Sequence, residues 1–169
     1  PPWVYSLMAL HVLGYPVDDG VVAKGLVGFE RFAIEESDSM RLQACISPLW
    51  DTCLTMIALL DSGLSPEHPA LTETGQWLLK EQVLTGGDWQ VKAKEIRPGG
   101  WAFEFDNDFY PDLDDTSETV MALDRLRLPS ETEKQEAIDR AVSWLIGRQS
   151  SNGGWAAFDK DNDKAVVSK

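Results

Sequence analysis

The feature that most constrains the fold of this chain is an internal repeat of helical patterns. Asp51-Thr52 recurs as Asp115-Thr116, and at the same interval Ala58-Leu59 recurs as Ala122-Leu123. Each repeated unit combines an apolar helical segment, a short turn, an amphipathic helical segment and a glycine-rich turn that carries a tryptophan. Because such units bury their apolar faces by stacking on one another, the repeat predicts an all-α protein.

The helical segments are of two alternating kinds. Residues 3–13, the segment that starts at Ser47-Pro48 and the segment that follows Asp112 are apolar on nearly every side and are expected to be buried helices. Residues 21–34, 69–82 and 133–148 are amphipathic, and no strand is expected. This alternation suits two concentric layers, so we expect part of an α/α barrel of helical hairpins. We assign residues 1–45 to the end of one barrel domain and residues 46–169 to part of a second.

The glycine-rich turns follow a recurring Gln and Trp pattern. Trp144, Leu145, Gln149, Gly153 and Trp155 match Trp77, Leu78, Gln82, Gly87 and Trp89, with one extra residue in the earlier copy. We expect a glutamine amide and an indole to close each turn, since buried polar groups need hydrogen-bond partners. Trp89, Trp144 and Trp155 are therefore interpreted as structural residues.

An acidic stretch lies directly behind a run of aromatic residues. From Glu104 to Glu118 there are seven carboxylates and no Lys or Arg. Carboxylates this crowded raise one another's pKa unless they are solvated or bind a cation, so one of Asp112, Asp114 and Asp115 is expected to hold a proton at neutral pH. Such an acid beside aromatic rings is suited to making a carbocation. The alternative is a solvated helix N-terminus with Asp115 as its N-cap.

Composition narrows the function further. The net charge of −13 argues against nucleic acid as a partner and leaves open a neutral apolar substrate or an apolar membrane contact. The two cysteines, Cys45 and Cys53, form no disulfide framework; we expect small buried side chains in a reducing, cytosolic setting. No apolar run is long enough to cross a bilayer, and no signal peptide is visible. Because the chain starts at Pro1 without Met, we expect it to be a piece of a longer protein.

Three sequence patterns together resemble the squalene–hopene cyclases, a family of bacterial triterpene cyclases. They are the Gln and Trp pattern that ends at Trp155, the run Asp112-x-Asp114-Asp115-Thr116, and Ser47-Pro48-Leu49-Trp50-Asp51-Thr52. The resemblance covers essentially the whole chain as an internal fragment of the family. The aspartate run alone also occurs in class II diterpene cyclases, and the repeated Gln and Trp pattern favours the triterpene branch.

The resemblance implies a two-domain α/α-barrel isomerase that cyclises squalene to hopene or hopanol without a metal or cofactor. Asp114 would protonate the terminal double bond, with Asp112 and Asp115 orienting it and tuning its acidity. Trp50 and Phe103 match cavity aromatics that stabilise cations, with ordinary core packing as the alternative reading. The whole protein would be a bacterial monotopic protein on the cytoplasmic side of the cell membrane. A homodimer is compatible with this family.

Other functions stay open at this point. They are another class II polyprenyl or diterpene cyclase, a non-catalytic α/α-barrel binding module, and a protein prenyltransferase subunit. The prenyltransferase would need Asp, Cys and His ligands for zinc, and Cys45 and Cys53 have no matching His. The family pairs its acids with a histidine from a later segment, which would lie beyond Lys169. The chain alone is therefore expected to be inactive. The product skeleton depends on cavity shape, which the sequence does not give.

Overall fold

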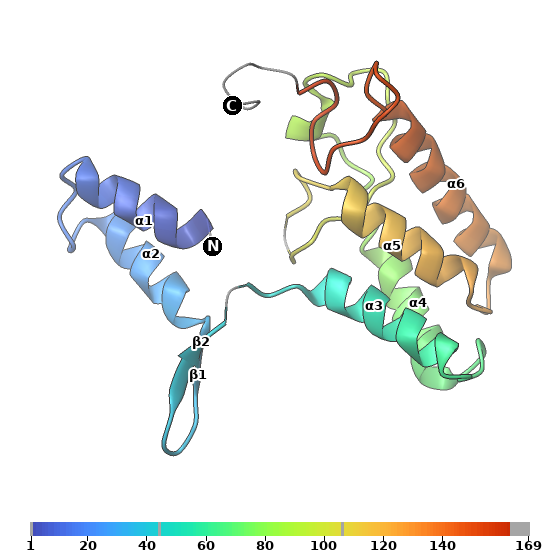
Figure 1. Cartoon of the computed structure of the whole chain (residues 1–169), viewed down its shortest axis with the longest axis horizontal. Helices are drawn as coiled ribbons and strands as arrows, with labels where there is room; N and C mark the ends of the chain where they lie inside the picture. Colours follow the sequence, from blue (N-terminus) through green and yellow to red (C-terminus); the bar gives the residue numbers. More distant parts are fainter. Residues whose placement is uncertain (1, 44, 106, 163–169) are drawn as a thin grey trace. The chain divides into compact units, whose positions relative to one another are not determined.

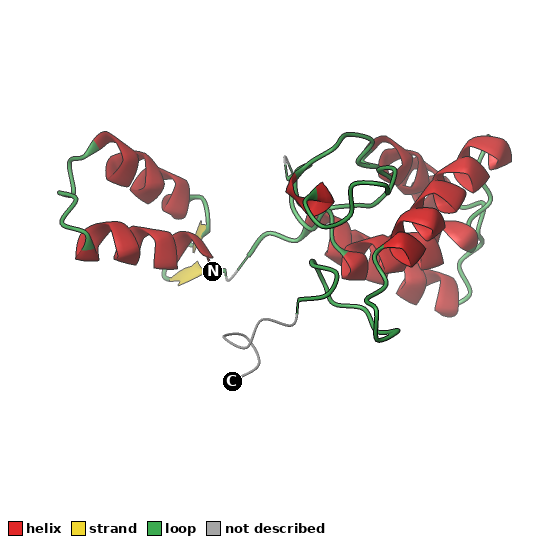
Figure 2. Ribbon diagram, turned by 90° about the horizontal axis from the view of Figure 1, so that it is seen from above, coloured by secondary structure: helices red, strands yellow, loops and turns green. Residues whose placement is uncertain are grey.

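The protein is helical in both of its parts. The computed structural model describes residues 2–43, 45–105 and 107–162, and the chain divides into two compact units, Pro1–Ile46 and Ser47–Lys169. Helices make up most of the regular structure of each unit (Figure 1; Figure 2). The helical class predicted from the repeat is confirmed, and the assignment of the two parts to two barrel domains stays a prediction.

The first unit is a helical hairpin followed by a short β-hairpin. Helix α1 (Pro2–Val12) packs against α2 (Gly20–Glu30). Gly14 adopts φ 85° just after α1, a left-handed conformation that favours glycine at a helix end. Asp19 caps α2, because its carboxylate accepts a hydrogen bond of 2.9 Å from the Val21 amide.

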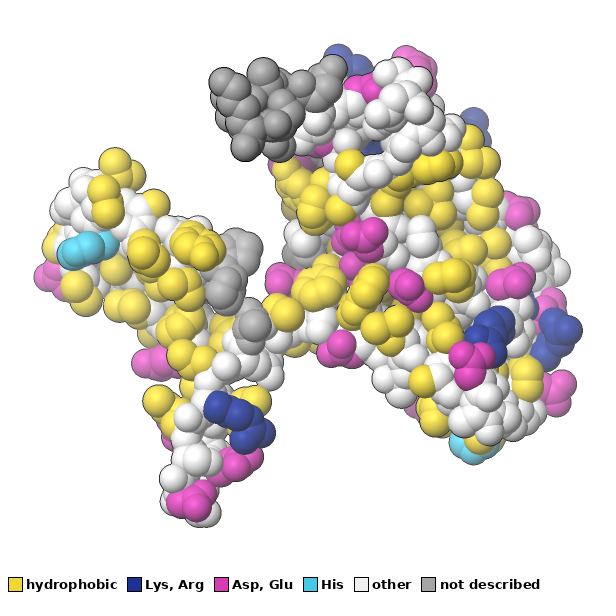
Figure 3. Space-filling model, in the orientation of Figure 1, with side chains coloured by type: hydrophobic (Ala, Val, Ile, Leu, Met, Phe, Trp, Pro, Cys, Tyr) yellow, Lys and Arg dark blue, Asp and Glu magenta, His cyan; other side chains and the backbone are white. Residues whose placement is uncertain are grey.

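The burial predicted for the first helix is not found in this unit. Tyr5, Met8 and Val12 on α1 are exposed, and Val22 is the residue of α2 that is buried. Figure 3 shows the hydrophobic side chains spread over the surface of this unit. Two helices of similar length cover only one face of each other, so an all-round apolar pattern needs further neighbours to become buried. Cys45, expected to be buried, is also exposed, whereas Cys53 in the second unit is buried as predicted.

The first unit also contains two strands, so the expectation of a strand-free chain is wrong. Strand β1 (Ala33–Glu35) pairs antiparallel with β2 (Met40–Leu42), and Ile34 lies opposite Arg41. Arg41 bonds the Glu36 carboxylate at 2.7 Å across the turn. Strands of three residues are too short to produce a recognisable alternation of apolar and polar side chains.

The second unit consists of two helical hairpins in contact. The hairpins are α3 (Pro48–Asp61) with α4 (Pro69–Lys80), and α5 (Leu113–Asp124) with α6 (Glu131–Gly147); a short 3₁₀ helix, η1 (Asp88–Gln90), lies in the long connection between them. Helix α5 packs against both α3 and α6 (Figure 1). Cys53, Leu78, Leu123 and Ala141, from all four helices, meet in one apolar core. No helix in the described ranges is long and apolar enough to cross a membrane.

The helix starts follow capping rules. Pro48 and Pro69 occupy first-turn positions, where the missing amide proton of proline has no consequence. Ser130 caps α6 by accepting a hydrogen bond from the Glu133 amide at 3.2 Å. Ser47 stands at the predicted N-cap of α3, but its hydroxyl donates to the Asp51 carboxylate at 2.8 Å instead of accepting from the backbone.

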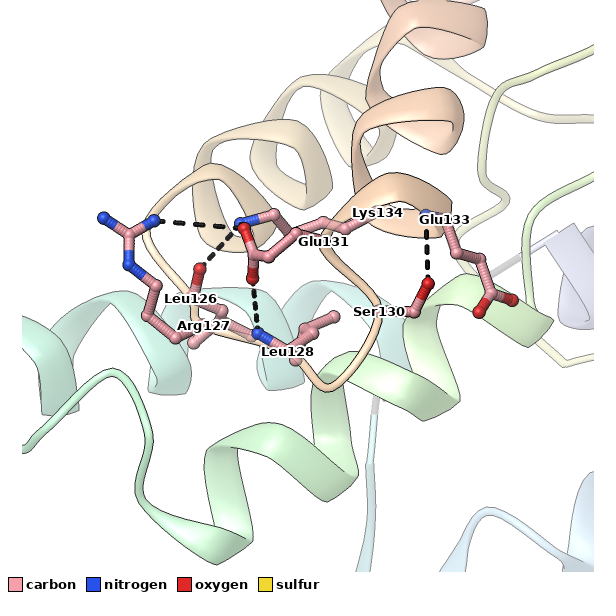
Figure 4. A network of polar contacts seen from close by, with 7 residues as sticks. All are labelled: Leu126, Arg127, Leu128, Ser130, Glu131, Glu133 and Lys134. Atoms are coloured by element: carbon pink, nitrogen blue, oxygen red, sulfur yellow. Dashed lines mark hydrogen bonds and ion pairs between the residues drawn. The ribbon is translucent and has the colours of Figure 1, made fainter.

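The turn between α5 and α6 is held by a polar network (Figure 4). The buried ammonium of Lys134 bonds the Leu126 carbonyl at 2.7 Å and the Glu131 carboxylate at 2.8 Å. The same carboxylate accepts from the Leu128 amide at 2.7 Å. These bonds satisfy the Leu126 carbonyl and the Leu128 amide in the turn that follows α5.

Two glycine-rich turns share one hydrogen-bond pattern. The Gln149 amide donates to the Gly153 carbonyl at 2.7 Å, and the Trp155 indole donates to the Leu145 carbonyl at 2.8 Å. In the earlier copy, Gln82 donates to Gly99 at 2.8 Å and Trp101 donates to Leu78 at 2.7 Å.

The predicted match of Gln82 with Gly87 and Trp89 is therefore wrong. The Trp89 indole nitrogen is buried and has no hydrogen-bond partner among the described residues. Trp89 instead packs edge-on against Trp144, with ring centroids 5.8 Å apart. The chain between Val83 and Pro98 is an insertion that separates Gln82 from its true partner turn.

Candidate active site

The aspartate run forms the N-terminus of α5. Asp112 is the N-cap, and its carboxylate accepts from the Asp115 amide at 2.8 Å. The expectation that Asp115 would be the N-cap in the solvated alternative is wrong, because Asp115 lies inside the first turn and is buried. An N-cap carboxylate that takes up one free amide stabilises both the helix and its own ionised form.

Both glycine-rich turns reach this helix end. The Trp101 carbonyl accepts from the Asp112 amide at 3.0 Å, and the Ala157 carbonyl accepts from the next amide, that of Leu113, at 2.9 Å. Tyr110 and Phe158 add an edge-on ring contact with centroids 6.0 Å apart. The position of the acidic turn is therefore set by two segments that lie far apart in the sequence.

Thr116 joins the first of these turns to the helix. Its buried hydroxyl accepts from the Trp101 amide at 2.9 Å and donates to the Asp112 carbonyl at 2.6 Å. Gly100 permits this close approach, because a Cβ there would lie 2.9 Å from the Thr116 hydroxyl oxygen and 3.1 Å from Pro111 Cβ. Thr116 entered the sequence reasoning only as part of a pattern. Its position one helical turn after Asp112 is the signal that indicates a back-bonded hydroxyl.

Two of the three aspartates, Asp112 and Asp115, are buried together, and both have raised pKa values. Burial raises the pKa of Asp115 to about 8, and the charge and hydrogen bond of Asp112 raise it as well. Burial also raises the pKa of Asp112, against the lowering effect of the Asp115 amide bond. Two carboxyl groups this close cannot both ionise easily, so Asp115 keeps its proton at neutral pH. The Asp112 carboxylate accepts the hydrogen bond from the Asp115 amide. The raised pKa of Asp115 agrees with the expectation that one carboxyl here holds a proton, and the catalytic roles of the three aspartates stay predictions.

The third aspartate lies differently. Asp114 is exposed in this chain, one residue before the buried Asp115. Trp50 on α3 and Phe103 beyond the first glycine-rich turn are half-buried. Among the described residues no ring contact or hydrogen bond joins Trp50 or Phe103 to the aspartates. The structure thus brings Asp112 and Asp115 together, and the roles of Asp114, Trp50 and Phe103 stay predictions.

A small hollow lies near this face of the second unit. It has a volume of ≈ 10 Å³ and is lined by Pro48, Leu49, Trp77, Glu81, Val83, Ala102, Glu104, Phe105 and Asp108. Trp77 and Phe105 meet edge-on in it, with centroids 6.4 Å apart. Neither Trp50 nor Phe103 lines the hollow. Within the described ranges no three His, Cys, Asp or Glu side chains are grouped to hold a metal ion.

The fold and the site define a class of protein: a helical protein with a buried aspartate pair of raised pKa at the N-terminus of a core helix. The comparisons place the chain within that class. Residues 46–169 match the model of the squalene-hopene cyclase C-terminal domain. The chain belongs to the squalene-hopene cyclase family.

Relatives across almost the whole chain agree with this assignment. The chain is 45% identical to a squalene–hopene cyclase of Alicyclobacillus acidocaldarius over 96% of its length and 26% of that protein. It is 49% identical to a dammaradiene synthase of Dryopteris crassirhizoma over 96% of its length and 24% of that protein. A squalene–hopene cyclase of Bradyrhizobium diazoefficiens is 42% identical over 96% of the chain and 25% of that protein. The chain spans about a quarter of the length of these relatives.

Proposed function

We propose that the whole protein to which this chain belongs is a squalene–hopene cyclase, an isomerase that cyclises squalene by protonation. The observation that carries the proposal is the buried Asp112–Asp115 pair directly beside Asp114, in a chain of this family. The terminal alkene of squalene would take the proton of Asp114 and become a tertiary cation. Successive alkenes would attack that cation and close the rings. Loss of a proton would give hopene, and capture of water followed by loss of a proton from its oxygen would give hopanol.

The assignment of Asp114 as the donor is supported by its position between the two buried aspartates at the N-terminus of α5. The pair carries one negative charge when only Asp115 is protonated, and this charge lies next to the first turn of α5. We propose that a cavity completed by the rest of the protein covers Asp114 and excludes water. Trp50 and Phe103 would then stabilise the cations with their ring faces.

We further propose the architecture and setting that this function needs. The chain would contribute to two α/α-barrel domains, with residues 1–45 in one and residues 46–169 in the other. The protein would lie as a monotopic protein on the cytoplasmic side of the bacterial membrane and take squalene from the lipid. A homodimer fits this arrangement. The chain alone would be inactive, because the remainder of the cavity wall lies in the other three quarters of the protein.

The test is the variant Asp114→Asn in the whole protein, incubated with squalene and analysed by gas chromatography with mass spectrometry. We expect hopene and hopanol formation to fall at least about a thousandfold, since an amide cannot donate this proton. Asp124→Asn, an exposed change on the same helix, is the matched control and should keep full activity. If the protein is a non-catalytic binding module, Asp114→Asn and Asp124→Asn should function equally well, with unchanged circular dichroism.

A second candidate concerns the product. The 49% identity to a dammaradiene synthase is as high as that to the squalene–hopene cyclases. A dammaradiene-type product would require the same initiating acid and a different end of the cascade. The mass spectrum and retention time of the product from the unmodified protein separate hopene and hopanol from dammaradiene.

A further inference from the structure

A line of polar side chains crosses the otherwise apolar contact between α3 and α5. It runs from Cys53 on α3 through Thr119 to Asp115 on α5. Cys53 and Thr119 are 0% exposed and Asp115 is 2% exposed. A valine would have almost the same shape as Thr119 and would suit this apolar contact better. A buried hydroxyl is unfavourable unless it is hydrogen-bonded, so its partners indicate what it does.

The direction of the hydrogen bonds follows from counting protons. The Thr119 hydroxyl donates to the Asp115 carbonyl at 2.8 Å, which uses its one proton. The contact of 3.4 Å between Cys53 Sγ and the Thr119 hydroxyl oxygen must then be donated by the thiol. Burial raises the pKa of Cys53 to about 11, so the thiol keeps its proton at neutral pH. The Cys53 thiol therefore donates to the Thr119 hydroxyl, which donates to the Asp115 carbonyl.

The orientation of the Asp115 carboxyl depends on its backbone as well as on its interaction with Asp112. Its Oδ1 atom is buried and has no hydrogen-bond partner among the described residues. No side chain of α3 or α6 therefore fixes this oxygen. A threonine hydroxyl that donates to a backbone carbonyl one turn earlier bends the helix slightly. The bend changes the direction in which the side chain of the earlier residue points. Thr116 holds the Asp112 carbonyl in the same way at 2.6 Å, so both buried aspartates have a back-bonded threonine one turn later.

We propose that Thr119, oriented by Cys53, is a positioning residue that sets the geometry of the Asp112–Asp115 pair. It acts through the Asp115 carbonyl and touches no substrate, and its catalytic consequence rests on the proposed cyclase function. The hydroxyl dipole points its positive end at Asp115 and so favours the carboxylate. The other titratable groups that act on Asp115 are Asp112, Asp114 and Glu118 on α5, and Cys53 itself from α3.

The experiment compares Thr119→Val with Thr119→Ser in the whole protein. Valine keeps the shape and removes the hydroxyl, whereas serine keeps the hydroxyl. Thr74→Val is the matched control, because Thr74 makes the same bond to the Ala70 carbonyl at 2.7 Å on α4, away from the aspartates. The first readout is a carboxyl ¹³C NMR titration of the aspartates. The second is kcat and KM for squalene as a function of pH.

We expect Thr119→Val to raise the upper titration midpoint of the pair by about half a pH unit. We expect kcat to fall about tenfold, with KM unchanged. Thr119→Ser should restore both values, and Thr74→Val should change neither. A smaller shift in the same direction is expected for Cys53→Ala.

An unchanged titration of the pair in Thr119→Val overturns the inference. A loss of activity that serine does not rescue, with the titration unchanged, shows a packing role only and overturns it as well. If Thr119→Val does not fold, Cys53→Ala decides by the same titration. If the unmodified protein makes no product from squalene, the proposed function fails, and the NMR titration still tests the positioning role.

Discussion

At the scale of single residues, the buried acid pair ties the stability of the protein to pH. The pKa of Asp115 is about 8 in the folded protein, against an ordinary value of 3.8. The folded form therefore binds this proton more tightly than the unfolded form does. The resulting stabilisation is complete below the ordinary pKa and is lost as pH rises through the folded value. Asp112 shifts in the same direction.

We predict that the free energy of unfolding falls between pH 4 and pH 8, by about 5 kcal/mol from Asp115, with a contribution of the same sign from Asp112. Asp115→Asn should remove most of that dependence, because the amide has no proton to lose. Urea unfolding at a series of pH values measures it. Asp124→Asn is the control for the general repulsion within a chain of net charge −13. A slope that is the same in both variants would contradict the prediction.

The sequence predicted part of this site at the residue scale. Crowding among Asp112, Asp114 and Asp115 indicated that one carboxyl would hold a proton, and burial puts that proton on Asp115. Crowding could not distinguish the buried aspartates from the exposed one, because that depends on which side of α5 faces α3. The contact between Cys53 and Thr119 could not be predicted either, since it joins two helices whose register only packing determines.

At the scale of elements, caps and hydrophobic periodicity predicted α3 to α6 within a few residues of their observed ends. The pairing of turns was less predictable. Gly87 and Trp89 have nearly the expected spacing after Gln82, but the hydrogen bonds go to Gly99 and Trp101 instead. Local spacing cannot show that residues 83–98 form a long loop between Gln82 and the turn it bonds. The path of that loop depends on contacts distant in sequence, such as the one between Trp89 and Trp144.

The first glycine-rich turn should be intolerant of even one added methyl group. In Gly100→Ala the new Cβ would lie 2.9 Å from the Thr116 hydroxyl oxygen, 3.1 Å from Pro111 and 3.2 Å from Trp144. A proline ring, an indole and a back-bonded hydroxyl cannot move aside easily. We predict a loss of about 1–3 kcal/mol in the free energy of unfolding. Urea unfolding followed by tryptophan fluorescence measures it.

The control for this variant is Gly20→Ala in α2, where a Cβ would meet nothing within 4 Å and φ is not in the left-handed region. It should leave stability unchanged or slightly higher, because alanine favours helix formation. Equal stability of the two variants would show that the turn at Gly100 relaxes freely and does not hold the acidic helix end in place.

At the scale of the whole molecule, the first unit carries more apolar surface than it can bury. Tyr5 is 70% exposed, Leu13 73% and Val12 84%, and Figure 3 shows hydrophobic side chains across this unit. The sequence predicted both helices of this unit correctly, but the predicted burial of the first is wrong. Burial would need further helices to cover the faces that a pair of helices leaves exposed. Apolar surface of this extent drives association in water.

We predict that the isolated chain self-associates through this unit. Sedimentation velocity should show oligomers at micromolar concentration, and a hydrophobic dye should bind. Replacing Met8, Val12 and Leu13 together by serine should shift the chain toward monomer, because each change removes exposed apolar area without opening a core. Unfolding of the second unit should be unaffected, since its core is formed by α3 to α6. If the same triple variant associates as strongly as the original, the contact surface lies on the second unit, where Val91 is the most exposed of the large apolar residues and the next to replace.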